Sequence, residues 1–484
     1  MKKRIIFFVL VISFLWLISG ISGESEFIIH LDETIKATDI FTLVNTLASP
    51  QYEGRLTGTA GYDKAVQMAA DYFKQYGIRP IDGMETYTQL FPVSYTKVYE
   101  SKLTLHVKDK NGKEEVLQCQ YFKDYYPMNF SGSGNITGEI VFAGFGITAP
   151  EFEYDDYIGI DVKGKIAMII KGAPKEKEGE DWSAYDDHRF RTKNALKHGA
   201  AGLLYIYSAR GNPNGAYLEG FPMLAIEEKL ADRILEKYRK NVKSLTEHLK
   251  QRHRNSFATD QTAELTVRSE NFQGNGANVV GYIPGSDELL RNEFIVVGAH
   301  LDHCGMWPQL TPGADDNASG SAALLTIARA LGTSKYQPKR SVLFALFGGE
   351  EMGLLGSTYL VSHLPEKVKK INFVFNLDMV GEGPDVFILR LKNYPEMEKI
   401  IMETPRKLNL NCHITGNEIT EKGRGGSDHA PFVEKRIPAV SVFSAGSKHM
   451  GYHKADDSIY WITPKIMEDI AKIISYTVMR MAAD

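Results

Sequence analysis

Residues 341–357 read SVLFALFGGEEMGLLGS, an unbroken apolar run followed by two adjacent glutamates and a glycine-rich turn. The apolar run has the length of a buried strand, and residues 353–364 predict a short helix after it. Charge is costly beside an apolar run and neighbouring carboxylates repel, so the pair Glu350-Glu351 calls for a function. A strand that ends in polar residues and leads into a helix is the repeating unit of an α/β sheet.

The same unit recurs on both sides of this stretch. Residues 294–302 (FIVVGAHLD) and 371–381 (INFVFNLDMVG) predict buried strands, and residues 319–331 predict a helix between them. The chain closes with a strand at residues 439–444 and a helix at residues 464–481. Continuous apolar strands that alternate with helices indicate a sheet covered on both faces. The sequence therefore predicts an α/β fold with a mostly parallel mixed sheet flanked by helices.

The chain has 484 residues, of which 43% are hydrophobic and 24% are charged, as in ordinary globular proteins. This length is too great for one ordinary core, so we expect two domains or one domain with an insertion. Residues 101–269 contain short strand-like runs and no cluster typical of a metal or nucleophile site, which predicts an inserted, non-catalytic domain. The net charge of −4 shows no excess of basic residues of the kind that nucleic-acid binding requires, so we expect no nucleic-acid partner.

The N-terminus has the pattern of a secretory signal peptide. A basic segment at residues 2–4 precedes an apolar run at residues 5–18, and small residues follow up to Gly23. This predicts a signal peptide at residues 1–23 and a secreted or periplasmic protein. An uncleaved membrane anchor is the alternative, although the run is short for spanning a bilayer. No later stretch is long and apolar enough to span one, so we expect no stable membrane span after signal removal.

Polar side chains stand where the predicted strands end. His300 and Asp302 end the first strand, Glu350 and Glu351 end the second, and Asp378 ends the third. In open α/β sheets, ligands bind beyond the carboxyl ends of the strands. We therefore expect one edge of the sheet to collect a histidine and several carboxylates.

Two further candidates lie in loops near this edge. Asp316 belongs to the stretch GADDNASG, and His453 follows the last strand in GYHKADDSIYW. Histidine and carboxylate ligands without cysteine suit zinc in an open catalytic site. The candidate ligands are more than one open zinc site needs, and they fit two ions if one carboxylate bridges them. The candidates are His300, Asp316, Glu351, Asp378 and His453.

Each of these residues alone has an ordinary explanation as a helix cap, a turn residue or an acid in the first turn of a helix. Their coincidence at the strand ends of one sheet favours a shared site. Adjacent carboxylates cannot point to the same place, so one glutamate would bind metal and the other would act as general base. Asp302 lies two residues after His300, where it could accept the second ring N–H of that histidine.

Six stretches between His300 and Tyr460, with their flanking residues, resemble the secreted co-catalytic zinc aminopeptidases, the family that also contains glutamate carboxypeptidase and the transferrin receptor. The stretches are GAHLDHCG, PGADDNASGSAALL, GGEEMGLLGS, NLDMVG, GGSDHAPF and YHKADDSIY. Residues 53–73 resemble the opening helix of that family, and residues 138–147 and 164–174 resemble its protease-associated domain. The resemblance implies a zinc-peptidase fold of the phosphorylase/hydrolase-like kind with an inserted β-rich protease-associated domain.

The resemblance also implies a role for each candidate ligand and two zinc ions per chain. His300 and Asp378 would hold one zinc, and Glu351 and His453 would hold the other. Asp316 would bridge the two ions, and its peptide bond to Asn317 is expected to be cis in this family.

The remaining roles concern catalysis and orientation. By the same resemblance, Glu350 would be the general base and Tyr452 would polarise the scissile carbonyl. Asp457 lies four residues after His453 and is expected to orient it. The implied organisation is a signal peptide at 1–23, an N-terminal part of the peptidase domain at 24–100, the protease-associated domain at 101–269 and the catalytic domain at 270–484.

These expectations describe a secreted two-zinc exopeptidase, most simply an aminopeptidase that acts on peptides. A carboxypeptidase or a dipeptidase on the same scaffold is the first alternative. A glutaminyl cyclase normally uses one zinc with fewer ligands. A non-catalytic binding module, as in the transferrin receptor, predicts missing ligands, and none of the five is missing here.

Overall fold

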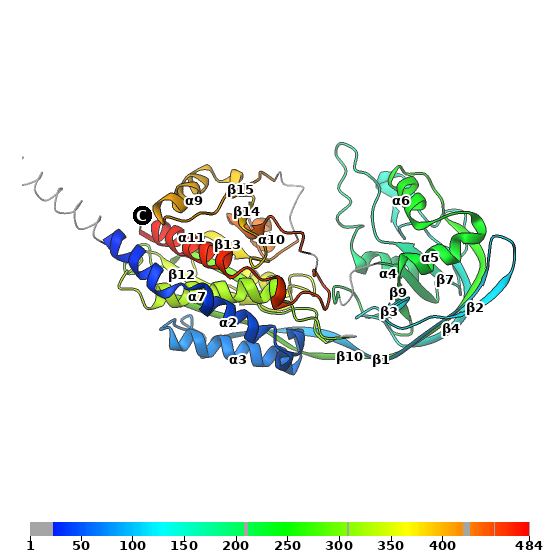
Figure 1. The fold of residues 1–484 in the computed structure, drawn as a ribbon, viewed down its shortest axis with the longest axis horizontal. Coiled ribbons are helices and arrows are strands. Elements are labelled where there is room, and N and C mark those ends of the chain that lie inside the picture. Colours follow the sequence, from blue (N-terminus) through cyan, green and yellow to red (C-terminus); the bar gives the residue numbers. More distant parts are fainter. Residues whose placement is uncertain (1–22, 208–211, 307–308, 420–425, 450, 484) are drawn as a thin grey trace, which may run out of the picture.

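Two lobes lie side by side in the computed structural model, joined by the long strands β1 (Thr88–Lys108) and β10 (Phe257–Ile283) (Figure 1). The structure describes residues 23–207, 212–306, 309–419, 426–449 and 451–483, so nearly all of the predicted signal peptide lies outside the described residues. We call residues 98–269 the small lobe and the rest of the described chain the large lobe. β1 and β10 pair antiparallel from one lobe into the other, so both lobes share one sheet.

The large lobe contains the parallel strands that the sequence predicts. β11 (Glu293–His300) pairs in parallel with both β12 (Ser341–Phe347) and β13 (Lys370–Leu377), and β13 pairs in parallel with β16 (Ala439–Ala445). The strand order in this part of the sheet is β15-β14-β16-β13-β11-β12-β10. Its antiparallel pairs are β1 with β10, β10 with β12 and β14 with β16, so the sheet is mixed as predicted. The outer strands are β14 (Asp385–Leu389) and β15 (Ile414–Gly416).

Helices cover both faces of this sheet because alternate residues of the strands point to opposite faces. Ile295 and Val297 of β11 join a core with α2, α3, α7, α9 and α11, whereas Phe294 and Val296 join a core with α8 and α10. The helices are α2 (Ala37–Leu47), α3 (Ala60–Gln75), α7 (Gly320–Gly332), α8 (Leu355–Ser362), α9 (Pro395–Lys407), α10 (Ala430–Glu434) and α11 (Pro464–Ala483).

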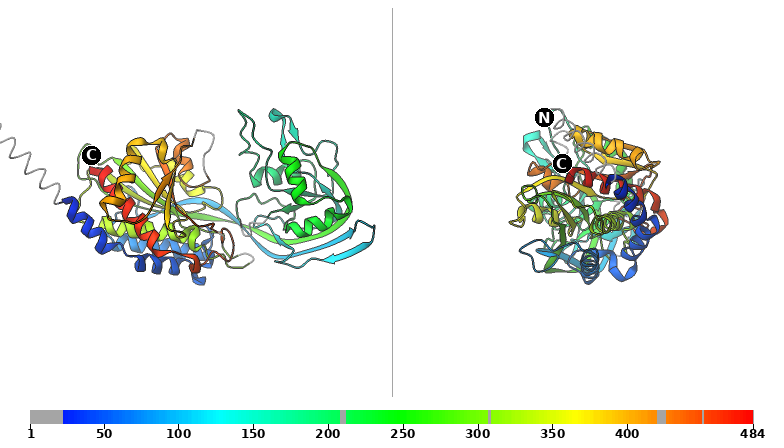
Figure 2. Two further views of the ribbon diagram at one scale, coloured as in Figure 1. Left: turned by 45° about the horizontal axis from the view of Figure 1, so that its top comes forward. Right: turned by 90° about the vertical axis from the view of Figure 1, so that its left-hand side faces the viewer.

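The small lobe stands apart from the large lobe except where the long strands join them (Figure 2). It has a parallel layer and two cores of its own. β4, β7, β8 and β9 pair in parallel in that order, and β3 pairs with β9 at one margin of this layer. β2 pairs with β1, on the far side of β10. One core contains residues of α5 and α6, and the other contains Ala195 of α4. The elements are β2 (Glu114–Gln118), β3 (Tyr125–Pro127), β4 (Gly134–Phe142), β7 (Ile166–Ile170), α4 (His188–Lys197), β8 (Gly202–Ile206), β9 (Met223–Ile226), α5 (Glu228–Leu235) and α6 (Val242–Lys250).

Residues 23–34 form a further helix, and the remaining elements are short. They are β5 (Thr148–Ala149) and β6 (Tyr154–Asp155), which pair with each other, and the helical turns η1 (Pro50–Arg55), η2 (Pro150–Phe152), η3 (Glu236–Tyr238), η4 (Ala314–Ser319), η5 (Leu391–Asn393) and η6 (Ile459–Trp461). Within the described residues, no helix combines the length and the apolar character needed to cross a bilayer.

Candidate metal centre

Three parallel strands deliver the predicted residues to one edge of the large-lobe sheet. His300 is the last residue of β11 and lies opposite Phe347, the last residue of β12. Glu350 and Glu351 follow β12 after two glycines, and Asp378 follows β13 directly. The parallel register places these chain ends at the same height of the sheet, as the sequence predicts.

The first group of side chains gathers around the ring of His300. Its Nε2 atom lies 3.3 Å from Oδ1 of Asp316 and 3.4 Å from Oδ1 of Asp378. The ligand atoms of these three residues all lie within 4.8 Å of one another, which is the spacing of a group that can hold one metal ion.

The second group gathers around the ring of His453. Its Nε2 atom lies 3.3 Å from Oδ2 of Asp316 and 2.9 Å from Oε2 of Glu351. Asp316 therefore directs one carboxylate oxygen to each group. The structure thus brings together all five predicted ligands, with Asp316 between the two pairs.

The backbone around Asp316 is shaped to hold it there. The peptide bond between Asp316 and Asn317 is cis, as the family resemblance implies. Gly313 adopts a left-handed backbone with φ of 58°, and a Cβ atom there would collide with the carbonyl oxygen of Asp316. This loop needs a glycine before the two aspartates, which explains the sequence GADD.

The chemistry of this donor set fits divalent cations. The five residues are at most 7% exposed, so their charges are largely removed from water. Burial alone would lower the pKa of His453, but Glu351 and Asp316 raise it to about 10. For Asp316 the effects are reversed. Burial alone would raise its pKa, but hydrogen bonds from His300 and His453 hold that pKa well below the usual value. The site therefore stabilises positive charge, and its imidazole and carboxylate donors suit zinc.

Glu350 occupies a different position from its neighbour. It lies outside the groups of candidate ligands found among the described residues, but it lines a cavity of about 140 Å³ together with His300, Asp316 and Asp378. Burial raises the pKa of Glu350 well above its usual value; His300 opposes this effect and Glu351 adds to it. A carboxylate with a raised pKa beside such a cluster has the properties of a proton acceptor.

Tyr452 lines the same cavity from the loop that carries His453. The two rings stack, with their centroids 3.9 Å apart and their planes inclined by 21°. The tyrosine as a whole remains 48% exposed.

Two predicted orienting contacts differ from the expectation. The carboxylate of Asp302 lies 3.8 Å from Nδ1 of His300, beyond hydrogen-bond distance, and the backbone carbonyl of Asp302 lies at 3.2 Å instead. The chain turns after β11, so the carbonyl faces the ring while the Asp302 side chain accepts from the Glu350 N–H at 3.2 Å. The sequence separation correctly indicated proximity but could not distinguish carbonyl from carboxylate.

The carboxylate of Asp457 does not orient His453 as predicted. It accepts hydrogen bonds from the backbone N–H groups of Asp315 at 2.8 Å and Asp316 at 3.0 Å. Within the described residues, Nδ1 of His453 has no hydrogen-bond partner. Asp457 therefore supports the loop of Asp316, because the turn after His453 points this side chain toward η4.

Sequence reasoning missed a second histidine at this edge. Nδ1 of His303 lies 2.6 Å from Oε1 of Glu351, and His303 is fully buried. His303, Cys304 and Glu351 also form a group whose ligand atoms lie within 4.8 Å of one another. The signal was the stretch HLDHCG, in which the second histidine follows the same strand end as His300.

A buried arginine was also missed. Arg55 is fully buried, and its guanidinium donates only to backbone carbonyls among the described residues. The acceptors are Leu301 at 2.9 Å, Leu47 at 2.7 Å, Pro312 at 2.8 Å and Gly313 at 2.8 Å. Two of the loops that carry the candidate ligands are thus held by one side chain of the N-terminal segment.

Comparisons with known proteins find relatives that match part of this chain. The chain is 31% identical over 246 residues to leupeptin-inactivating enzyme 1 of Streptomyces exfoliatus, a match that covers 46% of this chain and 52% of that protein. It is 27% identical over 352 residues to aminopeptidase YwaD of Bacillus subtilis, covering 69% of this chain and 67% of that protein. The chain therefore spans about half and about two thirds of the lengths of these two curated relatives.

A solved structure shares the fold over almost the whole chain. The aminopeptidase from Aneurinibacillus sp. strain AM-1 superimposes with a TM-score of 0.65 at 22% identity, covering 94% of this chain and 96% of that chain. Residues 278–478, which contain the strand ends and all five candidate ligands, match the family model of peptidase family M28. Over these residues the chain is therefore similar to peptidase family M28.

Proposed function

We propose that this chain is a two-zinc exopeptidase, and specifically an aminopeptidase that releases N-terminal residues from peptides. The observation that carries the proposal is the position of Asp316, whose two carboxylate oxygens face the His300 group and the His453 group separately. The relatives named above support the choice of aminopeptidase, since YwaD and the Aneurinibacillus protein both carry that name.

In this proposal, His300 and Asp378 would hold one zinc ion, Glu351 and His453 would hold the other, and Asp316 would offer one carboxylate oxygen to each. A bound pair of such ions polarises a carbonyl oxygen and makes water a stronger acid. His303 orients Glu351 through its 2.6 Å contact, which leaves the other oxygen of that carboxylate facing His453.

Two side chains of the protein then transfer the proton of the attacking water and stabilise the negative charge that develops on the substrate carbonyl oxygen. Glu350 accepts a proton from the attacking water and donates it to the leaving amine. Its raised pKa supports this role because a carboxylate with a higher proton affinity is a stronger base. The hydroxyl of Tyr452 donates a hydrogen bond to the substrate carbonyl oxygen as that oxygen gains negative charge.

We also propose an organisation for the rest of the chain. Residues 101–269 form an inserted protease-associated domain, supported by the separate cores of the small lobe and by the resemblance of residues 138–147 and 164–174. Residues 1–23 act as a signal peptide that directs the protein out of the cytoplasm.

A panel of aminoacyl p-nitroanilides and N-blocked peptides, assayed with and without a chelator, tests the function. We expect release of unblocked N-terminal residues, loss of activity on chelation and recovery with zinc. Exclusive cleavage of N-blocked peptides would favour the carboxypeptidase alternative. Activity that is indifferent to metal removal would contradict the zinc mechanism.

A further inference from the structure

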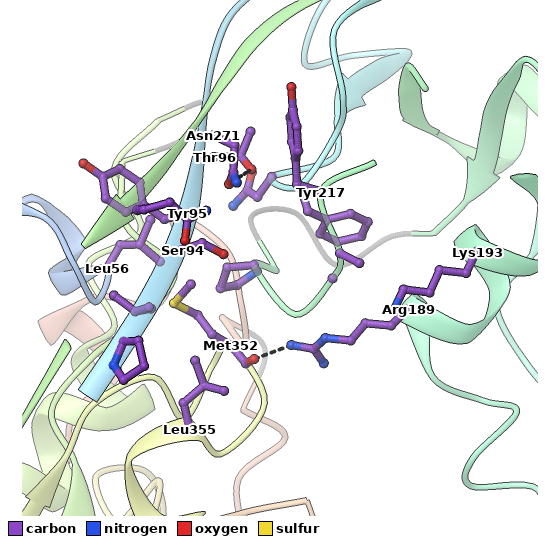
Figure 3. A pocket seen from close by; sticks show the side chains of 18 residues that line it. Leu56, Ser94, Tyr95, Thr96, Arg189, Lys193, Tyr217, Asn271, Met352 and Leu355 are labelled. Atoms are coloured by element: carbon purple, nitrogen blue, oxygen red, sulfur yellow. Dashed lines mark hydrogen bonds between the residues drawn. The ribbon is translucent and has the colours of Figure 1, made fainter. Parts of the chain in front are cut away.

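The largest feature next to the metal centre that has no assigned role is a cavity of about 480 Å³ between the two lobes (Figure 3). Its walls come from β1 and β10, from α4 of the small lobe, and from the segment that follows Glu351. The volume falls within the range of about 300–1,000 Å³ that is typical of ligand sites.

One residue that lines the cavity is the sequence neighbour of a candidate metal ligand. Met352 lines it and directly follows Glu351, and the Arg189 guanidinium donates to the Met352 carbonyl (Figure 3).

The charges around the cavity are of one sign. Arg189 and Lys193, both on α4, line it, and no carboxylate does so among the described residues. Arg189 is already engaged by the Met352 carbonyl and the side chain of Asn214. Lys193 is exposed and forms no hydrogen bond or ion pair with any described residue. The cavity therefore offers one uncommitted cation, together with amide side chains of Asn129 and Gln273.

We propose that this cavity binds the part of a short peptide that follows the cleaved residue, with Lys193 pairing its free C-terminal carboxylate. The inference rests on the proposed aminopeptidase function, in which the downstream part of the substrate must leave the metal centre along the protein surface. A substrate peptide with a C-terminal amide would lack the charge-assisted contact with Lys193. A small p-nitroanilide substrate would not reach Lys193.

Two tripeptides that differ only at the C-terminus test the proposal: Leu-Gly-Gly and its C-terminal amide, with leucine p-nitroanilide as the short reference substrate. We expect Lys193→Glu to raise KM for the free acid roughly tenfold, as for loss of a charged hydrogen bond. The variant should leave KM for the amide and for the p-nitroanilide unchanged. Lys197→Glu is the matched control, because Lys197 lies on the same helix and does not line the cavity.

Calorimetric binding of both tripeptides to the Glu350→Gln variant, alone and combined with Lys193→Glu, separates recognition from turnover. Tighter binding of the free acid that depends on Lys193 supports the cavity, even if the wild-type protein proves to have a different activity. Active enzyme whose KM values respond equally for acid and amide, or respond equally to Lys197→Glu, overturns the cavity proposal while leaving the aminopeptidase function intact.

Discussion

The guanidinium of Arg55 lies 2.8 Å from the carbonyl oxygen of Gly313, three residues before Asp316. The same side chain reaches the carbonyl of Leu301, next to His300, at 2.9 Å. Arg55 is therefore tied to the chain beside one ligand of the first group and to the loop of the shared carboxylate. Since it is fully buried, no water can replace its hydrogen bonds if the side chain is removed.

Arg55→Met should destabilise the protein by about 3–5 kcal/mol, because several buried carbonyl groups lose their donor. The measurement is the free energy of unfolding from a denaturant titration. Arg79→Met is the control, since Arg79 is exposed. An unchanged unfolding midpoint for Arg55→Met would contradict the idea that this residue holds the two loops.

Glu350→Gln and Glu351→Gln should separate the two adjacent glutamates. We expect Glu350→Gln to keep two zinc ions and to lose activity by about 10²–10⁴-fold, the usual effect of removing a general base. Glu351→Gln should lose zinc from the second group. Zinc content by elemental analysis and kcat decide the matter, and loss of zinc from Glu350→Gln alone would mean that the two roles are exchanged.

His303→Ala should weaken zinc binding by about 10–100-fold, because His303 orients the carboxylate of Glu351 at 2.6 Å. Competition with a chromogenic chelator measures this affinity. His363→Ala serves as control, since His363 is exposed on α8's C-terminal side. Equal zinc affinities for His303→Ala and the wild-type protein would show that the contact with Glu351 does not support metal binding.

Zinc should stabilise the folded protein because the folded state alone assembles the five ligands. Added zinc at 100 times its Kd should contribute about 2.7 kcal/mol per site to the free energy of unfolding. Thermal unfolding of the chelator-treated protein with added zinc measures the effect. Magnesium should add little to the free energy of unfolding, since it prefers oxygen ligands. An equal zinc effect in Glu351→Gln would place the stabilising ion elsewhere.

The strands of the large lobe were the most predictable part of the fold. β11, β12 and β13 are continuous apolar runs; β11 ends two residues before its predicted end, and β13 ends at Leu377, four residues before the predicted end at 381. The same runs made the edge of the sheet predictable, because a parallel strand ends where its apolar residues end. The predicted helices at 319–331 and 464–481 differ from α7 and α11 by no more than two residues at either end.

The contacts of the loops were less predictable. Asp302 and Asp457 lie near the metal centre, but their hydrogen bonds depend on how the backbone turns after β11 and after His453. Arg55 is more than 240 residues from its acceptor Leu301, and no local pattern marks that pairing. The predicted limits of the inserted domain, 101 and 269, fall inside β1 and β10. A change in the sequence pattern does not have to coincide with the end of a strand.

The shared strands also have a consequence for how the chain assembles. β10 lies between β12 of the large lobe and β4 of the small lobe, and its partner β1 is completed about 150 residues earlier in the chain. Pairing of β1 with β10 must close a loop that contains nearly the whole small lobe, which is costly in entropy and slow. Prior folding of the small lobe would shorten that loop. Order in the inserted segment would then be a condition for the sheet edge that carries Glu350 and Glu351 to form.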